Sequence, residues 1–366
     1  MPSADELLEQ VRGRNGLGDF GDESFVAPFR SLVSAINETA ELHPFGSFLA
    51  RRVLTVLLAN RLYVEHAWKR RTGADPPLGA DPVLITGLPR SGTTFLFHLL
   101  ACDPAHRTLA NWEASRPAPP PGWWNRRRPV RRAYSAAGLC AQRYLSPGLE
   151  RLHPVRTDGP EECTALLMAG FASQAFAALF HVPRYLDALR GHDYTPSIQY
   201  HRRQLQILDG PRPGARWLLK SPNHLPALGA VLAVYPGARI IQTHRELTDV
   251  VPSCAKLVAE FRRIFSDRED PREIEECVNT VLSEALRRSA AARRAAPASR
   301  CFDVAFEDLV AEPMEVVRAA YRHFDLDLGG VAEAGMRATI RRARNRGAWS
   351  GRPSPGVEPF SVPLVE

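Results

Sequence analysis

Closely spaced cysteines are missing from this sequence. The chain has six cysteines in 366 residues, no two of them lie within ten residues of each other, and none forms a CxxC pair. This spacing argues against both a structural zinc site and the dense disulfide framework of a small secreted domain. Scattered thiols are typical of a reducing compartment, so we expect a cytoplasmic protein that needs no metal.

A secretory leader and a clear membrane span are also missing. Residues 1–15 carry early acids and no apolar segment, which argues against a signal peptide. Residues 163–183 contain no Asp, Glu, Lys or Arg, and their length approaches that of a membrane span. Polar residues interrupt this stretch and Ala outnumbers Leu, so we interpret it as a buried core helix and expect no transmembrane segment.

The excess of positive charge is small. The chain has 47 Lys and Arg against 40 Asp and Glu, a formal net charge of +7, and its densest basic run is 126–132 (RRRPVRR). This excess suggests an anionic partner such as nucleic acid, acidic lipid or a nucleotide, but an Arg-rich solvated surface explains it more simply. The length and a hydrophobic fraction of 45% provide for a full core, which excludes general disorder.

Strands and helices alternate along the middle of the chain. Residues 1–75 have helical periodicity and predict an N-terminal helical extension. Within 76–340, apolar runs are each followed by a turn and a helical pattern, which predicts an α/β fold with a parallel sheet flanked by helices. The predicted strands are 83–86, 216–219, 239–243 and 301–305.

Two segments interrupt or follow this alternation. Residues 114–157 begin with a Pro- and Arg-rich stretch and are predicted to form a lid-like excursion over a site. Residues 341–366 are rich in proline with little periodicity, so we expect an extended C-terminal tail.

The segment 87–94 (GLPRSGTT) is the strongest local motif. It follows a predicted strand and opens a predicted helix, the context in which backbone N–H groups cradle a phosphate. Thr93 occupies the position at which the loop of a nucleoside triphosphatase carries lysine, and the nearest cation is Arg90. Since no strand ending in a metal-binding Asp is evident either, the sequence argues against ATP or GTP hydrolysis.

Two further strand ends carry cations. Lys220 follows the apolar run 216–219, and Arg245 follows the run 239–243, with Ser253 eight residues further on. Ligands of open α/β sheets lie beyond the carboxyl ends of the strands. We therefore expect Lys220 and Arg245 to reach the same ligand as the loop, with Ser253 adding a hydroxyl.

Together these motifs resemble the P-loop sulfotransferases that use 3′-phosphoadenosine 5′-phosphosulfate, bacterial members included. The loop resembles their 5′-phosphosulfate loop, and 238–253 (ARIIQTHRELTDVVPS) resembles their 3′-phosphate motif. Residues 218–225 (LLKSPNHL) resemble the segment with a catalytic lysine in tyrosylprotein-type members, and 301–313 resemble a late strand–helix segment of bacterial members. The resemblance covers residues 80 to 325 and implies a central five-stranded parallel sheet.

The resemblance also implies roles for individual residues. Arg90 and Lys220 would bind the transferring sulfuryl group and the bridging oxygen. The 5′-phosphate would be held by Ser91, Gly92, Thr93 and Thr94. Arg245 and Ser253 would hold the 3′-phosphate, and adenosine 3′,5′-bisphosphate would be the product.

Two residues are candidates for the general base. Tyrosylprotein-type members use a Glu about twenty residues beyond the loop arginine, and Glu113 lies near that place. Cytosolic members use a His in a K-x-H-L-P-like motif, and His224 precedes Leu225-Pro226. We favour Glu113 over His224.

The sequence therefore predicts in-line sulfuryl transfer to a hydroxyl of a small acceptor, without a metal. The donor has no γ-phosphate, which agrees with the missing loop lysine. A P-loop small-molecule kinase is the enzyme alternative. A basic nucleic-acid-binding protein is the alternative of another class, although no recognition motif supports it and we expect no nucleic-acid partner.

Overall fold

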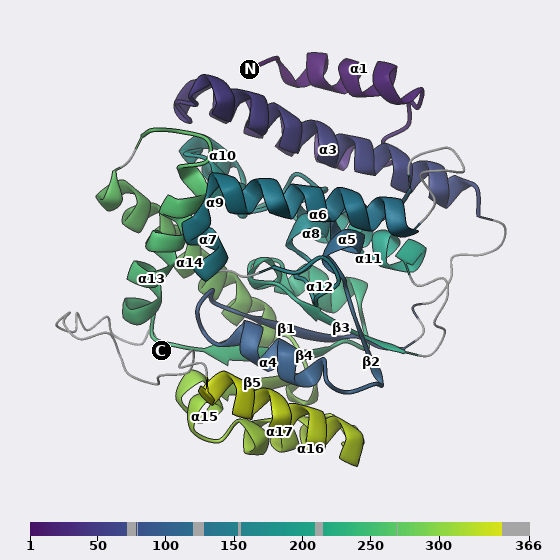
Figure 1. Cartoon of the computed structure of the whole chain (residues 1–366), viewed down its shortest axis with the longest axis vertical. Helices are drawn as coiled ribbons and strands as arrows, with labels where there is room; N and C mark the ends of the chain where they lie inside the picture. The colour runs from purple at the N-terminus through teal and green to yellow at the C-terminus, as the bar shows by residue number, and fades with distance from the viewer. Residues whose placement is uncertain are drawn as a thin grey trace.

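A five-stranded parallel sheet forms the centre of the molecule (Figure 1). The computed structural model describes residues 1–71, 78, 80–119, 128–152, 155–208, 215–268 and 270–345. The strand order is β2-β3-β1-β4-β5, and every neighbouring pair is parallel. The strands are β1 (Val83–Gly87), β2 (His106–Thr108), β3 (Arg216–Lys220), β4 (Arg239–His244) and β5 (Cys301–Ala305). The predicted parallel α/β fold is confirmed, and β2 is the strand that the sequence did not reveal.

Both faces of the sheet are covered, which explains its continuous apolar strands. On one face, Val83 and Ile85 pack in a cluster with α4 (Thr93–Leu100), α16 (Pro313–His323) and α17 (Gly330–Asn345). On the other face, Leu84 belongs to a larger cluster that includes α11 (Thr195–Leu208) and α12 (Leu228–Val234). The alternation of side chains along β1 thus places successive residues in two different cores.

The N-terminal helical segment joins the larger of these clusters. It consists of α1 (Ala4–Asn15), α2 (Val26–Thr39) and α3 (Pro44–Lys69), with the short η1 (Glu23–Phe25) between α1 and α2. Arg61 of α3 is 2% exposed and donates hydrogen bonds to the carbonyls of Phe20, Asp22 and Ala169. A buried guanidinium with three carbonyl partners fixes α3 against the rest of the chain.

The remaining helices lie around the carboxyl ends of the strands or link them (Figure 1). They are α5 (Asn111–Ser115), α6 (Arg128–Leu145), α7 (Pro147–Leu152), α8 (Thr164–Met168), α9 (Phe176–Leu179), α10 (Pro183–Ala188), α13 (Leu247–Arg262), α14 (Pro271–Arg294), α15 (Phe306–Ala311), η2 (Pro222–His224) and η3 (Ala298–Arg300).

The charge-free stretch 163–183 differs from its prediction. It is largely buried, as expected, but it forms the separate helices α8 and α9 rather than one core helix. Phe171, between them, has a left-handed φ of 56°, which a continuous helix does not allow. None of the helices in the described ranges combines the length and apolar composition that crossing a bilayer requires.

The structure describes parts of two other predicted segments. The excursion 114–157 contains the helices α6 and α7, and the basic run from Arg128 onward lies in α6, while Arg126 and Arg127 lie outside the described residues. Helix α17 continues to Asn345, so 341–345 are helical rather than part of an extended tail. The rest of that predicted tail, 346–366, lies outside the described residues.

Candidate active site

The loop between β1 and α4 depends on left-handed backbone conformations. The φ angles are 146° at Gly87, 67° at Arg90 and 86° at Gly92. A Cβ atom at Gly87 would lie 2.3 Å from Thr243 Oγ1 on β4, so glycine is required there. Non-glycine residues with positive φ are uncommon and often mark functional sites, and Arg90 is such a residue.

Ser91 holds this loop together from the inside. It is fully buried, its Oγ donates to the Leu88 carbonyl over 2.5 Å, and it lies 2.6 Å from Thr243 Oγ1. Its backbone N–H also donates to the Leu88 carbonyl. The geometry therefore assigns the Ser91 side chain to shaping the loop, rather than to the predicted contact with a phosphate.

Lys220, at the end of β3, makes contacts with both the loop helix and a carboxylate. Its Nζ donates to Thr94 Oγ1 over 3.0 Å and forms an ion pair with Glu162. The Lys220 residue is 1% exposed, whereas the Glu162 side chain keeps 16% exposure. The Glu162 carboxylate also accepts a hydrogen bond from Thr164 Oγ1 over 3.1 Å. This arrangement places the Lys220 ammonium group and the Glu162 carboxylate beside the start of α4.

The cations of the other strand ends converge on the same loop. Arg245 donates to the Arg90 carbonyl over 3.0 Å, and Arg90 Nε donates to Ser253 Oγ over 3.2 Å. The Arg245 guanidinium lies 4.2 Å from the centre of the Phe306 ring and 3.7 Å from the Asp249 carboxylate. Residues far apart in the sequence, Arg90, Arg245 and Ser253, are thus brought together as the sequence predicted.

Glu113, the favoured base, has a structural position. Its carboxylate accepts a hydrogen bond from the Ala110 N–H over 3.0 Å, at the start of α5, and lies 3.5 Å from Arg107. Its side chain is 14% exposed, and Glu113 is not among the described residues that line the cavity. This carboxylate caps a helix and pairs with a buried arginine, so the geometry does not favour Glu113 as the general base.

His224, the other candidate base, lies behind Lys220 in η2. It is 1% exposed, and burial lowers the pKa of its ring to about 4. Neither ring nitrogen has a hydrogen-bond partner among the described residues, and His224 does not line the cavity in that part of the chain. The predicted role of His224 as the general base therefore finds no support in this geometry.

Glu162 is the functional candidate that the sequence reasoning missed. It lies in the loop before α8, and its position depends on the antiparallel bridge between Ala110 and Pro160 and on the hydrogen bond from the Cys163 N–H to the Lys220 carbonyl. No motif surrounds it. One weak signal was present, because Glu161 and Glu162 are the last charges before the neutral stretch 163–183.

A single cavity of about 850 Å³ connects these groups to an apolar chamber. Its polar end includes Arg90, Thr94, Glu162 and Arg245. The apolar end lies between α9, α13 and α14 and includes Leu257, Val258, Phe261, Val278, Val281 and Leu282. The cavity therefore offers space for an anionic ligand and an apolar one side by side.

Comparison with known proteins now identifies the class. The sequence model of a family described as "Sulfotransferase family" matches residues 82–329, which is more than half of the chain. The chain belongs to this sulfotransferase family. No curated protein matches the sequence.

Two solved structures share the fold over nearly their whole length. The sulfotransferase STF1 from Mycobacterium tuberculosis H37Rv is 34% identical, with a TM-score of 0.80, and the match covers 92% of this chain and 93% of that one. The sulfotransferase STF9 from Mycobacterium avium is 27% identical, with a TM-score of 0.81, and the match covers 93% of this chain and 88% of that one. The N-terminal helices are thus part of the shared fold.

Proposed function

We propose that this protein transfers a sulfuryl group from 3′-phosphoadenosine 5′-phosphosulfate to the hydroxyl group of a small apolar acceptor. The observation that carries the proposal is the contact of Lys220 Nζ with Thr94 Oγ1 and Glu162, two residues that line one cavity. Sulfuryl transfer requires an in-line arrangement with neutralised oxygens, and this contact brings a cation and a carboxylate base together beside the cavity.

The polar end fits the three anionic groups of the donor. Backbone N–H groups at the start of α4, with Thr93 and Thr94, would hold the 5′-phosphate. Arg245 and Ser253 would hold the 3′-phosphate, with Arg90 between the two sites. Arg90, Lys220 and Arg245, together with these hydroxyls, would offset much of the negative charge of this nucleotide without a metal.

Glu162 replaces Glu113 and His224 as the proposed general base. The acceptor hydroxyl gives its proton to the Glu162 carboxylate as its oxygen forms a bond to sulfur. The bond between sulfur and the bridging phosphate oxygen breaks, and Lys220 and Arg90 stabilise the charge that this oxygen gains. The products are a sulfate ester and adenosine 3′,5′-bisphosphate.

The apolar end supports an acceptor with a hydrophobic skeleton. The lining side chains from α13 and α14 are chiefly Val, Leu and Phe, which offer no partners for a polyhydroxylated sugar. An alcohol or phenol with one hydroxyl directed toward Glu162 would bury its apolar part there. This narrows the acceptor from any small hydroxylated molecule to an apolar one.

Transfer of labelled sulfate from the donor tests the proposal. We expect ester formation with apolar alcohols or phenols and little with sugars. Calorimetry adds a second measurement, in which adenosine 3′,5′-bisphosphate binds and ATP with Mg²⁺ does not. Absence of both transfer and bisphosphate binding would refute the proposal, and binding of ATP–Mg²⁺ alone would favour a kinase.

A further inference from the structure

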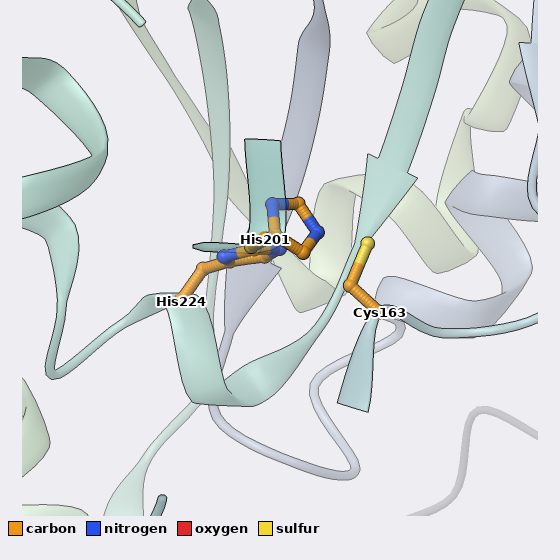
Figure 2. Close-up of side chains that lie close together, drawn as sticks. All are labelled: Cys163, His201 and His224. Carbon is orange, nitrogen blue, oxygen red and sulfur yellow. The ribbon is translucent and has the colours of Figure 1, made fainter. Parts of the chain in front are cut away.

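Three buried side chains with metal-binding chemistry meet behind Lys220. They are Cys163, which precedes α8, His201 of α11 and His224 of η2 (Figure 2). One ligand atom of each lies within 4.8 Å of the others. All three residues are 0–1% exposed. The proposed sulfuryl transfer assigns no role to these three side chains.

The histidine nitrogen atoms of this cluster lack most of the hydrogen bonds that buried polar atoms usually make. Both ring nitrogens of His224 and Nε2 of His201 are buried without a hydrogen-bond partner among the described residues. Buried polar atoms nearly always have a partner, so unpartnered ones indicate an ion or water that completes the group. One nitrogen atom from each histidine, beside one thiol, makes the donor set of a thiophilic metal ion.

The contact of His201 with Tyr235 has the form found around metal-binding histidines. His201 Nδ1 lies 2.8 Å from the Tyr235 hydroxyl oxygen. When Nδ1–H donates to that oxygen, the lone pair on Nε2 is free for a metal. A hydrogen bond from the second ring nitrogen commonly orients metal-binding histidines in this way.

We infer that Cys163, His201 and His224 bind one d¹⁰ metal ion, Zn²⁺ or Cu⁺, in a buried site behind the catalytic lysine. Ligand atoms around one such ion lie roughly 3.3–3.6 Å apart, so the three side chains would move inward by about 1 Å. Both ions accept sulfur and imidazole ligands without a strong geometric preference.

The charge of the site separates the two ions. One thiolate and two neutral imidazoles make a neutral centre with Cu⁺ and a centre of charge +1 with Zn²⁺. A net charge in a closed, buried site is costly, and the neighbouring Glu162 carboxylate is already paired with Lys220. The three ligands therefore fit Cu⁺ better than Zn²⁺.

A bound ion would stabilise the segments that carry the proposed catalytic pair. Cys163 follows Glu162 directly, and its N–H donates to the Lys220 carbonyl over 2.9 Å. His224 lies four residues after Lys220, in η2. An ion that joins Cys163 to His224 and to α11 would hold both segments at a fixed separation, which is a structural role beside the active site.

The metal content of the purified protein tests this inference independently of sulfuryl transfer. Because the ligands are buried, the full chain is produced in cells supplied with Zn²⁺ or copper, purified under reducing conditions and dialysed against metal-free buffer. We expect one ion per chain in the wild type and none in Cys163→Ser. Cys301→Ser removes another buried thiol, outside the cluster, and should keep the ion.

Two further measurements cover the case in which Cys163→Ser fails to fold. Tyr235→Phe should weaken metal affinity roughly ten- to hundredfold, because it removes the partner of His201. X-ray absorption of the wild type should show one sulfur and two imidazole ligands. The inference would be overturned if the wild type held no more metal than a metal-free control. A bound ion with only oxygen ligands would overturn it as well.

Discussion

The two ends of the cavity are built by different kinds of element. The polar end lies at the carboxyl ends of β1, β3 and β4, where the pairs Ile85↔Lys220 and Gly87↔Thr243 fix the register. The apolar end lies between α9, α13 and α14, whose positions depend on side-chain packing. Backbone hydrogen bonds thus define the proposed site for the donor, whereas exchangeable side chains define the proposed site for the acceptor. Mutations at the two ends should separate these functions.

The largest effect is expected from Lys220→Ala. It removes the cation beside the bridging oxygen, and we expect kcat to fall roughly 10²- to 10³-fold. Turnover measured under donor saturation gives the result, with circular dichroism to verify folding. Lys256→Ala, an exposed lysine on α13, is the matched control and should keep its activity. Near-wild-type turnover in folded Lys220→Ala would contradict the proposed role.

The next largest effect is expected from Glu162→Gln, compared with Glu113→Gln. We expect kcat to fall about 10²-fold, because the amide of Gln cannot accept the proton that the carboxylate accepts. Glu113→Gln should keep most of its turnover, because that carboxylate caps α5. The pH dependence of kcat, measured for both variants, completes the comparison. A larger loss in Glu113→Gln than in Glu162→Gln would reverse the assignment.

Arg245→Ala should weaken donor binding without abolishing turnover. A hydrogen bond to a charged group contributes about 1.5–3 kcal/mol, so the dissociation constant of adenosine 3′,5′-bisphosphate should rise roughly ten- to hundredfold. Calorimetry measures this constant directly. The control is Arg287→Ala, whose side chain is 69% exposed on α14. Unchanged bisphosphate affinity in Arg245→Ala would remove this residue from the donor site.

The smallest effect is expected at the apolar end. Val281→Ala removes two carbon atoms from the cavity wall, which weakens contact with an apolar acceptor by about 1.5 kcal/mol. The acceptor KM should rise roughly tenfold while bisphosphate affinity stays constant. A change in bisphosphate affinity instead would show that the two ends do not act separately.

The polar end was largely predictable from the sequence, and the proposed base was not. The loop with Arg90, and the strand ends with Lys220 and Arg245, follow short apolar runs, and parallel strands necessarily bring such ends together. Glu162 reaches the same place through a loop without regular structure. Glu113 was a reasonable hypothesis by spacing, but the nearby Arg107 and the start of α5 bind its carboxylate.

Local sequence determined the parallel sheet, the glycine-dependent loop and the order of the cations, because strand periodicity and left-handed turns depend on neighbouring residues. Tertiary structure alone decided which carboxylate meets Lys220 and how Cys163, His201 and His224 converge. These contacts join segments up to 61 residues apart, from position 163 to 224, and depend on how loops and helices pack over the sheet. Cysteine spacing indicated no metal site, because the ligands inferred here lie on separate elements that only the fold brings together.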